Sequence, residues 1–577
     1  MCFNWHGSAR AEEVVNLGPL ALLVPLLERL NIAALIDRHL PPDPQLEFSH
    51  GHVLSLLLAA RLSQPTALVN VATWAEQTGA DLLWNIPTDK LNDDRLGRAL
   101  EAFFDHRHSI QACVAEQALR LAELTPTRLH FDPTHIHFYG AYDTSQPRPP
   151  ELPLPPATPS ALFPSAHPTF GYGAADVKLV QAGVTAVIDD AGALPVFSQL
   201  LDGNHNGHTA IDEQFQLLQH YLPPAPDLLM VSDRGTFSVA HVARLERHDC
   251  KVLCAVPWHE YRALFAQHRD ALFWVPASYL SREQQRRRHT NSRLPQEHYE
   301  LAVLYHHLTD PETQEIIPCR VLFVFSTADQ KICRQTRAKT MAALQAGLDR
   351  IAASVQRGHP RSTPQAIARR VTKLFGKKSA RHYFRWELVP LTPAEQAALP
   401  PPARGCRRPT HRFVWHFDAQ AAEADAADDG YSALVTTAPR TRSADSLFTY
   451  FKQQNYLELL HHQWKTPLAV RPVFLKSPKR VEALVCLLQL ALTAYQLLER
   501  LYRQRVPDDA PPSEQRLTSE SLLRHFRVYG LVCQQQATGR VVYATRLTSR
   551  QRQILEQLGF PTPAQFLSQR LPHHPSG

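Results

Sequence analysis

The chain has 577 residues, of which 44% are hydrophobic and 20% charged, and its formal net charge is +7. This length excludes a single ordinary domain and predicts about two to four, and the apolar fraction is ample for buried cores. The modest positive charge suits a polyanionic partner, although many metabolic enzymes share it.

Cysteine usage and the N-terminus bear on the compartment. The nine cysteines are scattered, which is typical of a reducing cytoplasm and excludes a tight disulfide framework. Cys250 and Cys254 lack a second pair of ligands, which favours buried strand residues over a zinc site. Residues 1–6 have no basic segment leading into an apolar core, so no signal peptide is expected. The most apolar helical stretch, 483–498, is shorter than a membrane span and predicts a buried core helix with no membrane partner.

Residues 1–125 show apolar residues at helical spacing. The pattern is clear at 20–30 and 52–61, and the run 91–103 begins with Asn and Asp, which are good N-cap residues. We therefore expect an α-helical N-terminal domain.

From residue 126 the pattern changes to short apolar strands. Strand-like runs occur at 128–138, 177–188, 195–201, 227–232 and 251–257. Helical patterns at about 209–221 and 238–248 precede the last two runs. Three strands followed by alternating helix and strand predict an α/β fold with an RNase H-like catalytic core, a mixed five-stranded sheet with flanking helices, whose first part is 126–258. The proline-rich segment 146–168 is expected to form an exposed loop.

Residues 259–440 interrupt this core. Basic stretches, a long helix near 334–357, and strands such as 320–325 and 412–417 predict an inserted α+β subdomain. Residues 441–505 should complete the core, with a helix that carries Glu458 and a second helix at 480–503. Residues 506–577 are expected to be a C-terminal helical tail.

Three acidic residues fall at chemically suggestive places in these elements. Asp132 lies within the first strand, Asp233 follows the fourth, and Glu458 lies in a late helix. Mg²⁺ and Mn²⁺ prefer carboxylate oxygens, and two ions ~4 Å apart can activate an attacking oxygen and stabilise the leaving one. An isolated aspartate at a strand end is more often a turn or cap residue. The ordered triple instead predicts a phosphoryl-transfer site for two Mg²⁺ or Mn²⁺ ions.

The helix that carries Glu458 also carries a lysine, Lys465. Phe451, Gln454, Glu458 and Lys465 are spaced to share one helical face, and Lys465 lies two turns after the glutamate. A lysine there can hold a DNA phosphate near the metals. The alternative is an ordinary solvated lysine on a polar face.

Several segments, taken in order, resemble those of bacterial insertion-sequence transposases of the DDE type, close to the IS4/IS1634 group. The matching segments are 40–45 and 91–100 in the N-terminal region, then 132–142, 171–178, 201–204, 231–235, 451–458 followed by Lys465, and 475–484. The resemblance implies a DNA transposase that binds the terminal inverted repeats of an insertion sequence, cuts there with metal ions, and joins the freed ends to target DNA.

The resemblance also implies residue roles. Asp132, Asp233 and Glu458 would be the catalytic metal ligands. The DNA-binding residues would be Lys465, Lys178, Gln454, Lys452 and Arg234. The implied partners are double-stranded DNA, both as element ends and as target, and a second copy of the chain, giving a homodimer in the bacterial cytoplasm beside the nucleoid. By analogy, the N-terminal helical domain would bind the repeats.

Two departures from the family pattern keep other functions open. The usual Tyr-x-x-Arg before the glutamate appears as Phe451 and Gln454, and the usual His-Arg-Pro between Tyr172 and Asp176 is missing. The alternatives are an inactive or repurposed sequence-specific DNA-binding protein, and an RNase H-like nuclease without strand transfer. Basic stretches at 282–289 and 369–385 fit a DNA partner, or are solvated surface helices.

Overall fold

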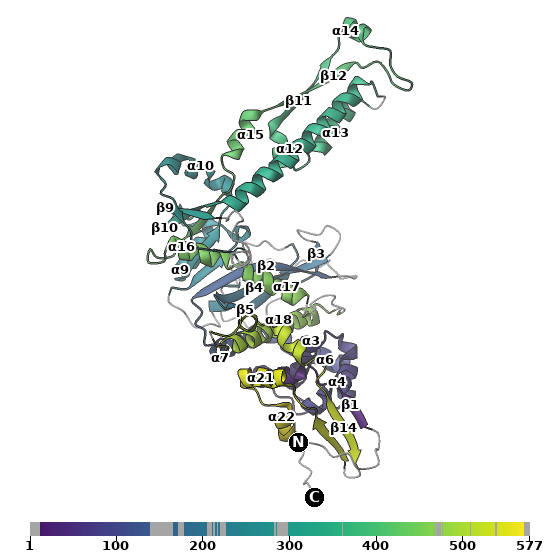
Figure 1. Ribbon diagram of the computed structural model, residues 1–577, viewed down its shortest axis with the longest axis vertical. Coiled ribbons are helices and arrows are strands. Elements are labelled where there is room, and N and C mark those ends of the chain that lie inside the picture. The colour runs from purple at the N-terminus through teal and green to yellow at the C-terminus, as the bar shows by residue number, and fades with distance from the viewer. Residues whose placement is uncertain are drawn as a thin grey trace.

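The computed structural model describes most of the chain. The residues described are 12–138, 165–170, 178–204, 211, 214, 215, 217–219, 227–281, 284, 298–359, 362–466, 468, 475, 477–507, 509–536 and 539–570. The molecule is elongated, with both chain ends at one pole, a large sheet in the middle, and a projecting arm at the other pole (Figure 1).

The two ends of the chain form one region. Strand β1 (Glu12–Val15) pairs with β14 (Leu531–Gln536), which pairs with β15 (Gly539–Ala544), all antiparallel. The C-terminal segment, expected to be helical only, therefore also contains two strands. The N-terminal helices are α1 (Leu20–Arg29), α2 (Ile32–Asp37), α3 (His50–Ser63), α4 (Val71–Thr78), α5 (Ala80–Trp84), α6 (Asp93–Asp105) and α7 (Arg107–Leu121). The C-terminal ones are α19 (Pro512–Gln515), α20 (Ser519–His525), α21 (Ser549–Leu558) and α22 (Pro563–Arg570).

Five strands of the central sheet follow the sequence prediction closely. They are β2 (Arg128–Phe138), β4 (Lys178–Asp189), β5 (Gly192–Asp202), β6 (Leu229–Ser232) and β7 (Lys251–Ala255). Their spatial order is β5-β4-β2-β6-β7, with β4 antiparallel to β2 and β5, and β6 parallel to β2 and β7. The first three strands form an antiparallel meander, and the last two return parallel to the first.

The sheet is larger than the expected five strands. It has ten, because β13 (Tyr431–Thr436), β10 (Ile316–Ser326), β9 (Tyr299–Thr309) and β8 (Val275–Pro276) continue it beyond β7. At the other side, β3 (Thr169–Phe170) pairs with β4. Without β13, strand β7 would present a row of unpaired backbone groups, so the added strands satisfy this edge. Part of the expected insertion 259–440 thus belongs to the sheet rather than to a separate subdomain.

The remainder of the insertion, residues 327–426, forms the projecting arm (Figure 1). Its elements are α12 (Thr327–Gln356), α13 (Pro364–Phe375), β11 (Phe384–Pro390), α14 (Pro393–Ala398), β12 (His411–Phe417) and α15 (Ala419–Ala426). Strands β11 and β12 form an antiparallel hairpin. The arm has a hydrophobic cluster of its own, in which Leu344 and Leu348 of α12 pack with Val371 of α13 and Phe384 of β11. It is therefore a packed unit rather than a loose loop.

A long buried helix joins the sheet to the N-terminal helices. Helix α18 (Pro478–Arg503) packs on β5, α3, α6 and α7. Among the described helices it alone is long and apolar enough to cross a membrane, yet its apolar window is wholly buried inside the protein, as predicted for a core helix. Arg107 of α7 donates to Glu482 of α18 at 2.6 Å, and both side chains are buried. The N-terminal helices, α18 and the sheet thus share one hydrophobic core.

Four further helices flank the sheet: α9 (Val239–Arg247), α10 (Trp258–His268), α16 (Ala444–Lys452) and α17 (Asn455–Lys465). The side chains of β6 alternate between two clusters. Leu229 and Val231 pack with Leu447 of α16, whereas Met230 packs with Val242 of α9. Helices α16 and α9 therefore cover opposite faces of the sheet.

Candidate active site

The sheet places Asp132 and Asp233 side by side. In the parallel pair β2–β6, Phe131 is in register with Ser232, so the next residues on the two strands are the two aspartates. Neighbouring strands lie ~4.8 Å apart, so their backbones are close. Asp132 alternates with Phe131 and points to the face that α17 covers, where Lys465 of α17 donates to Thr134 of β2 at 2.5 Å.

Asp233 begins a tight turn after β6. Its Oδ1 accepts a hydrogen bond from the backbone N–H of Arg234 at 2.6 Å, and its carbonyl accepts from Thr236 Oγ1 at 2.7 Å and from Cys254 Sγ at 3.3 Å. Asp233 thus caps the turn while its side chain remains exposed. Cys254 lies buried in β7, as expected, with Cys250 buried just before the strand.

The segment before the glutamate is not one continuous helix, contrary to the expectation of a single shared face. Helix α16 ends at Lys452 and α17 begins at Asn455. Gln453, at the break, accepts from Arg128 of β2 at 2.8 Å. Gln454 donates to the carbonyl of Phe131 at 3.3 Å. Both glutamines therefore tie the start of α17 to the strand that carries Asp132. Phe451, in the last turn of α16, instead packs against the hydrophobic cluster under that helix.

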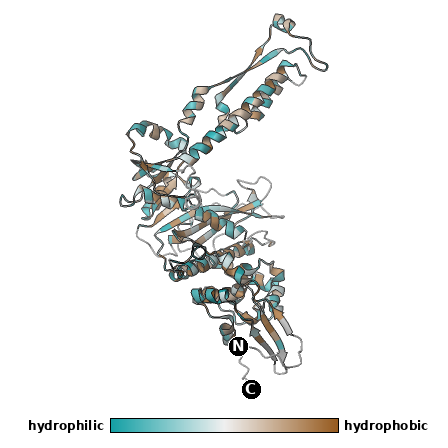
Figure 2. Ribbon diagram, in the orientation of Figure 1, coloured by the Kyte–Doolittle hydropathy of each residue, from teal (hydrophilic) through white to brown (hydrophobic). Residues whose placement is uncertain are grey.

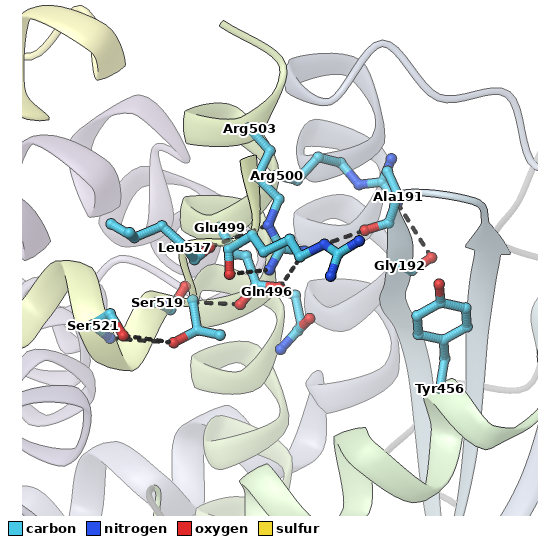
Figure 3. Close-up of polar contacts among 12 residues, drawn as sticks. Ala191, Gly192, Tyr456, Gln496, Glu499, Arg500, Arg503, Leu517, Ser519 and Ser521 are labelled. Carbon is cyan, nitrogen blue, oxygen red and sulfur yellow. Dashed lines mark hydrogen bonds and ion pairs between the residues drawn. The ribbon is translucent and has the colours of Figure 1, made fainter. Parts of the chain in front are cut away.

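The β4–β5 turn fixes the other side of α17. Asp190 Oδ1 accepts from Gln453 Nε2 at 2.7 Å, and its carbonyl accepts from the Tyr456 hydroxyl at 3.3 Å. Asp189 receives two hydrogen bonds from Arg500 of α18, at 2.8 and 2.6 Å. Figure 3 shows Arg500 on α18 and Tyr456 on α17 at the Ala191–Gly192 turn, where Arg500 donates to the Gly192 carbonyl. These contacts hold α17, and with it Glu458, against the sheet.

The three acidic side chains interact electrostatically. The pKa of Asp132 is raised to about 7, first because the carboxyl is largely buried, and then because Asp233 and Glu458 repel its negative charge. Lys465 acts in the opposite direction and lowers this pKa. A strand, a strand end and a helix thus bring together three carboxylates that are far apart in the sequence. Glu458 lies exposed in the first turn of α17, where the helix dipole favours a negative charge.

One site residue was missed by the sequence analysis. His461 Nδ1 lies 3.4 Å from Asp132 Oδ2, and the imidazole is buried. Burial, and then the charge of Lys465, lower the pKa of His461 to about 3, so the ring is neutral and the contact is not an ion pair. The available signal was spacing, because His461 is three residues after Glu458 and four before Lys465, on the same helical face.

The expected DNA-binding residues fall into two groups. Lys465 and Arg234 lie at the acidic cluster, and Gln454 lies beside it on the backbone of β2. Lys178 pairs with Phe138, six residues along β4 from Val184, the partner of Asp132, which is a separation of ~20 Å. Lys452 lies over the rings of Tyr299 and Phe448, at 4.7 and 5.3 Å, and burial lowers its pKa. The structure therefore does not bring Lys178 and Lys452 to the acidic cluster.

The carboxylates suit a divalent cation chemically. Three mutually repelling hard oxygen donors are the set that Mg²⁺ and Mn²⁺ prefer, and a bound cation would relieve the repulsion that raises the pKa of Asp132. As the side chains stand, no group of three His, Cys, Asp or Glu residues in the described part of the chain is placed to hold a metal ion. The three carboxylates must therefore move closer together before they can share one. Residues 171–177 and almost all of 282–297, where basic residues were missing or expected, lie outside the described residues, as does 146–164 of the proline-rich segment.

The N-terminal part of the chain is similar to a known protein family. Residues 12–114 match a family described as a domain of unknown function, DUF4277. No curated protein matches the chain. A solved piggyBac transposase, in a synaptic complex with hairpin DNA, aligns over 96% of this chain and 88% of its own, with 8% identity and a TM-score of 0.32. A TM-score this low does not establish a shared fold.

Proposed function

We propose that the chain is a DNA transposase that binds the terminal inverted repeats of an insertion sequence and catalyses metal-dependent DNA cleavage and strand transfer. The observation that carries the proposal is the convergence of Asp233 and Glu458 on the largely buried Asp132, where burial and their negative charges raise the pKa of Asp132 to about 7. A carboxyl group whose pKa is strongly raised by burial and by neighbouring carboxylates is characteristic of catalytic sites.

The strand order supports an RNase H-like core. Three antiparallel strands are followed by two parallel strands, and the acids lie on the first strand, after the fourth strand, and on a later helix. This is the arrangement implied by the resemblance to DDE transposases of the IS4/IS1634 group.

The roles of the side chains follow from their positions. Asp132, Asp233 and Glu458 would hold Mg²⁺ or Mn²⁺. Two ions would be needed, one beside the attacking oxygen and one beside the leaving oxygen. Such ions, when bound, activate water and neutralise charge at phosphorus. Lys465 would hold a phosphate beside the acids, because its ammonium group lies against β2 next to Asp132. Arg234 would contact the same DNA from the other rim.

The remaining expected contacts are proposed with narrower roles. Lys178 would contact DNA farther along the sheet, whereas Gln454 and Lys452 would act by holding the junction of α16 and α17 near the strand. Two DNA ends must be joined together, so the working form would be a homodimer on DNA, in the bacterial cytoplasm beside the nucleoid.

A strand-transfer assay tests the proposal. DNA carrying the inverted repeats that flank the gene is incubated with Mg²⁺ and with wild type, Asp233→Asn, or the control Asp249→Asn. Asp249 is an exposed residue that precedes β7, at the opposite end of the parallel strands. We expect joined product with wild type and with the control, and none with Asp233→Asn.

Other outcomes select the alternatives. Cleavage without joined product would indicate an RNase H-like nuclease. Equal DNA binding by wild type and Asp233→Asn, with no cleavage by either, would indicate an inactive or repurposed DNA-binding protein.

A further inference from the structure

The positive charge of the chain is concentrated in the arm. Residues 327–426 contain 18 Lys and Arg but seven Asp and Glu, a net charge of +11. The whole chain carries +7, so the rest of it has a net charge of −4. The arm alone therefore makes the protein basic.

Three of the seven acidic residues of the arm are engaged in contacts within it. Asp349 accepts from Trp415 Nε1 at 3.1 Å, Glu395 completes the capping box of α14, and Asp418 caps α15. By contrast, the run 362–386 holds seven Lys and Arg and no Asp or Glu, and all seven of these side chains are exposed. The surface of this run thus presents positive charge without compensating carboxylates of its own.

Ion pairs fix the start of the arm to the central part of the molecule. Arg337 of α12 forms two hydrogen bonds with the carboxylate of Asp429, one of them at 2.6 Å. Asp428, the residue before Asp429, forms an ion pair with Arg262 of α10, in which Arg262 Nε lies 2.5 Å from Asp428 Oδ2. These contacts join the root of the arm to the sheet, and the hydrophobic cluster within the arm stiffens its length. Helix α12 has 30 residues and is therefore ~45 Å long.

The aromatic side chains of the arm face inward. Tyr383 and Phe384 are buried, and the Trp386 ring stacks on Phe413 within the hydrophobic cluster. Proteins that bind single strands stack bases on exposed aromatic rings, whereas duplex phosphates need only Lys and Arg. Figure 2 shows hydrophilic and hydrophobic positions alternating along the two long helices of the arm. The surface therefore suits a phosphate backbone rather than unpaired bases.

We propose that the arm is a second DNA-binding surface, separate from the active site, that holds the phosphate backbone of double-stranded DNA. The choice of DNA as the polyanion rests on the proposed function. A length of ~45 Å exceeds one turn of duplex, ~34 Å, so the arm can follow a full turn of DNA. Contacts of this kind fix position and add affinity that depends on salt but little on sequence.

The test is the salt dependence of binding without catalysis. Affinity for a fluorescent duplex is measured by anisotropy between 50 and 200 mM salt, as typical conditions, in EDTA. The arm variant is Arg369→Gln, Lys373→Gln and Lys377→Gln, three exposed residues spaced four apart. The matched control is Arg516→Gln, Arg527→Gln and Arg552→Gln, three exposed residues of the C-terminal region.

Each phosphate contact contributes a slope of ~0.9 to the logarithmic salt plot, so the arm variant should lose up to ~2.7 in slope and the control should lose none. Equal losses in both variants would overturn the proposal, as would an unchanged slope in an arm variant that is folded by circular dichroism. Tighter binding to a single strand, or full competition by anionic phosphatidylserine vesicles, would also overturn it. Because EDTA prevents cleavage, failure of the strand-transfer assay with an intact arm-dependent slope would count against the proposed function alone.

Discussion

The edge of the sheet and the arm use charged side chains in opposite ways. At the sheet edge, Asp233, Glu458 and Lys465 all act at close range on the pKa of the largely buried Asp132. In the arm, 18 basic residues come from one continuous stretch, and nearly all that are described are exposed. Coulomb interactions are strong where water is excluded and are screened where it is not. A single substitution should therefore have a large effect in the body, whereas in the arm the number of charges should matter.

The largest expected effect is at the buried pair between α7 and α18. Arg107→Met leaves the Glu482 carboxylate buried without its cation, and breaking such a pair costs ~3–5 kcal/mol of unfolding free energy. The control is Arg120→Gln on the same helix, which removes an exposed pair with Glu116 worth at most ~0.5 kcal/mol. Urea unfolding measures both. Equal costs for the two variants would remove the distinction between buried and exposed charge.

The second prediction concerns pH. The pKa of Asp132 is about 7 in the folded protein, above its ordinary value, so the folded state binds this proton more tightly than the unfolded state. The resulting stability is fully present below about pH 4 and is lost as pH rises to about 7, by at most ~4 kcal/mol. In EDTA, Asp132→Asn should remove this slope and unfold at higher urea concentration than wild type at pH 7. Asp249→Asn should keep the wild-type slope. A constant difference between wild type and Asp132→Asn from pH 4 to 7 would contradict the shifted pKa.

Sequence patterns predicted the local elements of the sheet well. Strand β2 has the predicted limits because Thr134, Ile136 and Phe138 alternate with less buried residues along its second half. Helix α12 was expected from about 334 and starts at Thr327, because the Ser326 side chain accepts from the N–H of Asp329 and caps it. Local chemistry alone decides features of this kind.

Long-range pairing was not predictable from the same patterns. Strand β13 joins β7 in the sheet after an excursion of some 170 residues that contains the arm, and β1 pairs with β14 across almost the whole chain. No local periodicity specifies such partners. His461 was missed for a related reason. A histidine in a helix is unremarkable until the fold sets it against Asp132.

The third prediction tests His461 as a positioning residue. His461→Phe keeps a ring of similar shape but removes the nitrogen that contacts Asp132. Loss of a group that orients a metal ligand typically costs 10–100-fold in activity or metal affinity, so strand transfer should fall by ~10–100-fold. The loss should shrink at high Mg²⁺, because a displaced ligand weakens metal binding first. The exposed neighbour His462→Phe is the control. A loss that does not depend on Mg²⁺ would mean that His461 serves packing rather than the site.

The smallest expected effect is that of one charge on the arm. Lys373→Gln should lower the logarithmic salt slope by ~0.9, so that its affinity defect relative to wild type changes by only ~3-fold between 50 and 200 mM salt. The side chain is exposed, and screening leaves it little influence on its neighbours, so its effect should add to those of Arg369→Gln and Lys377→Gln. Duplex binding of the single and triple variants measures this additivity. If Lys373→Gln alone abolished the slope of the triple variant, the arm would hold a compact phosphate pocket. Its charges would then act together on one bound group, as Asp233, Glu458 and Lys465 act together on Asp132 at the edge of the sheet.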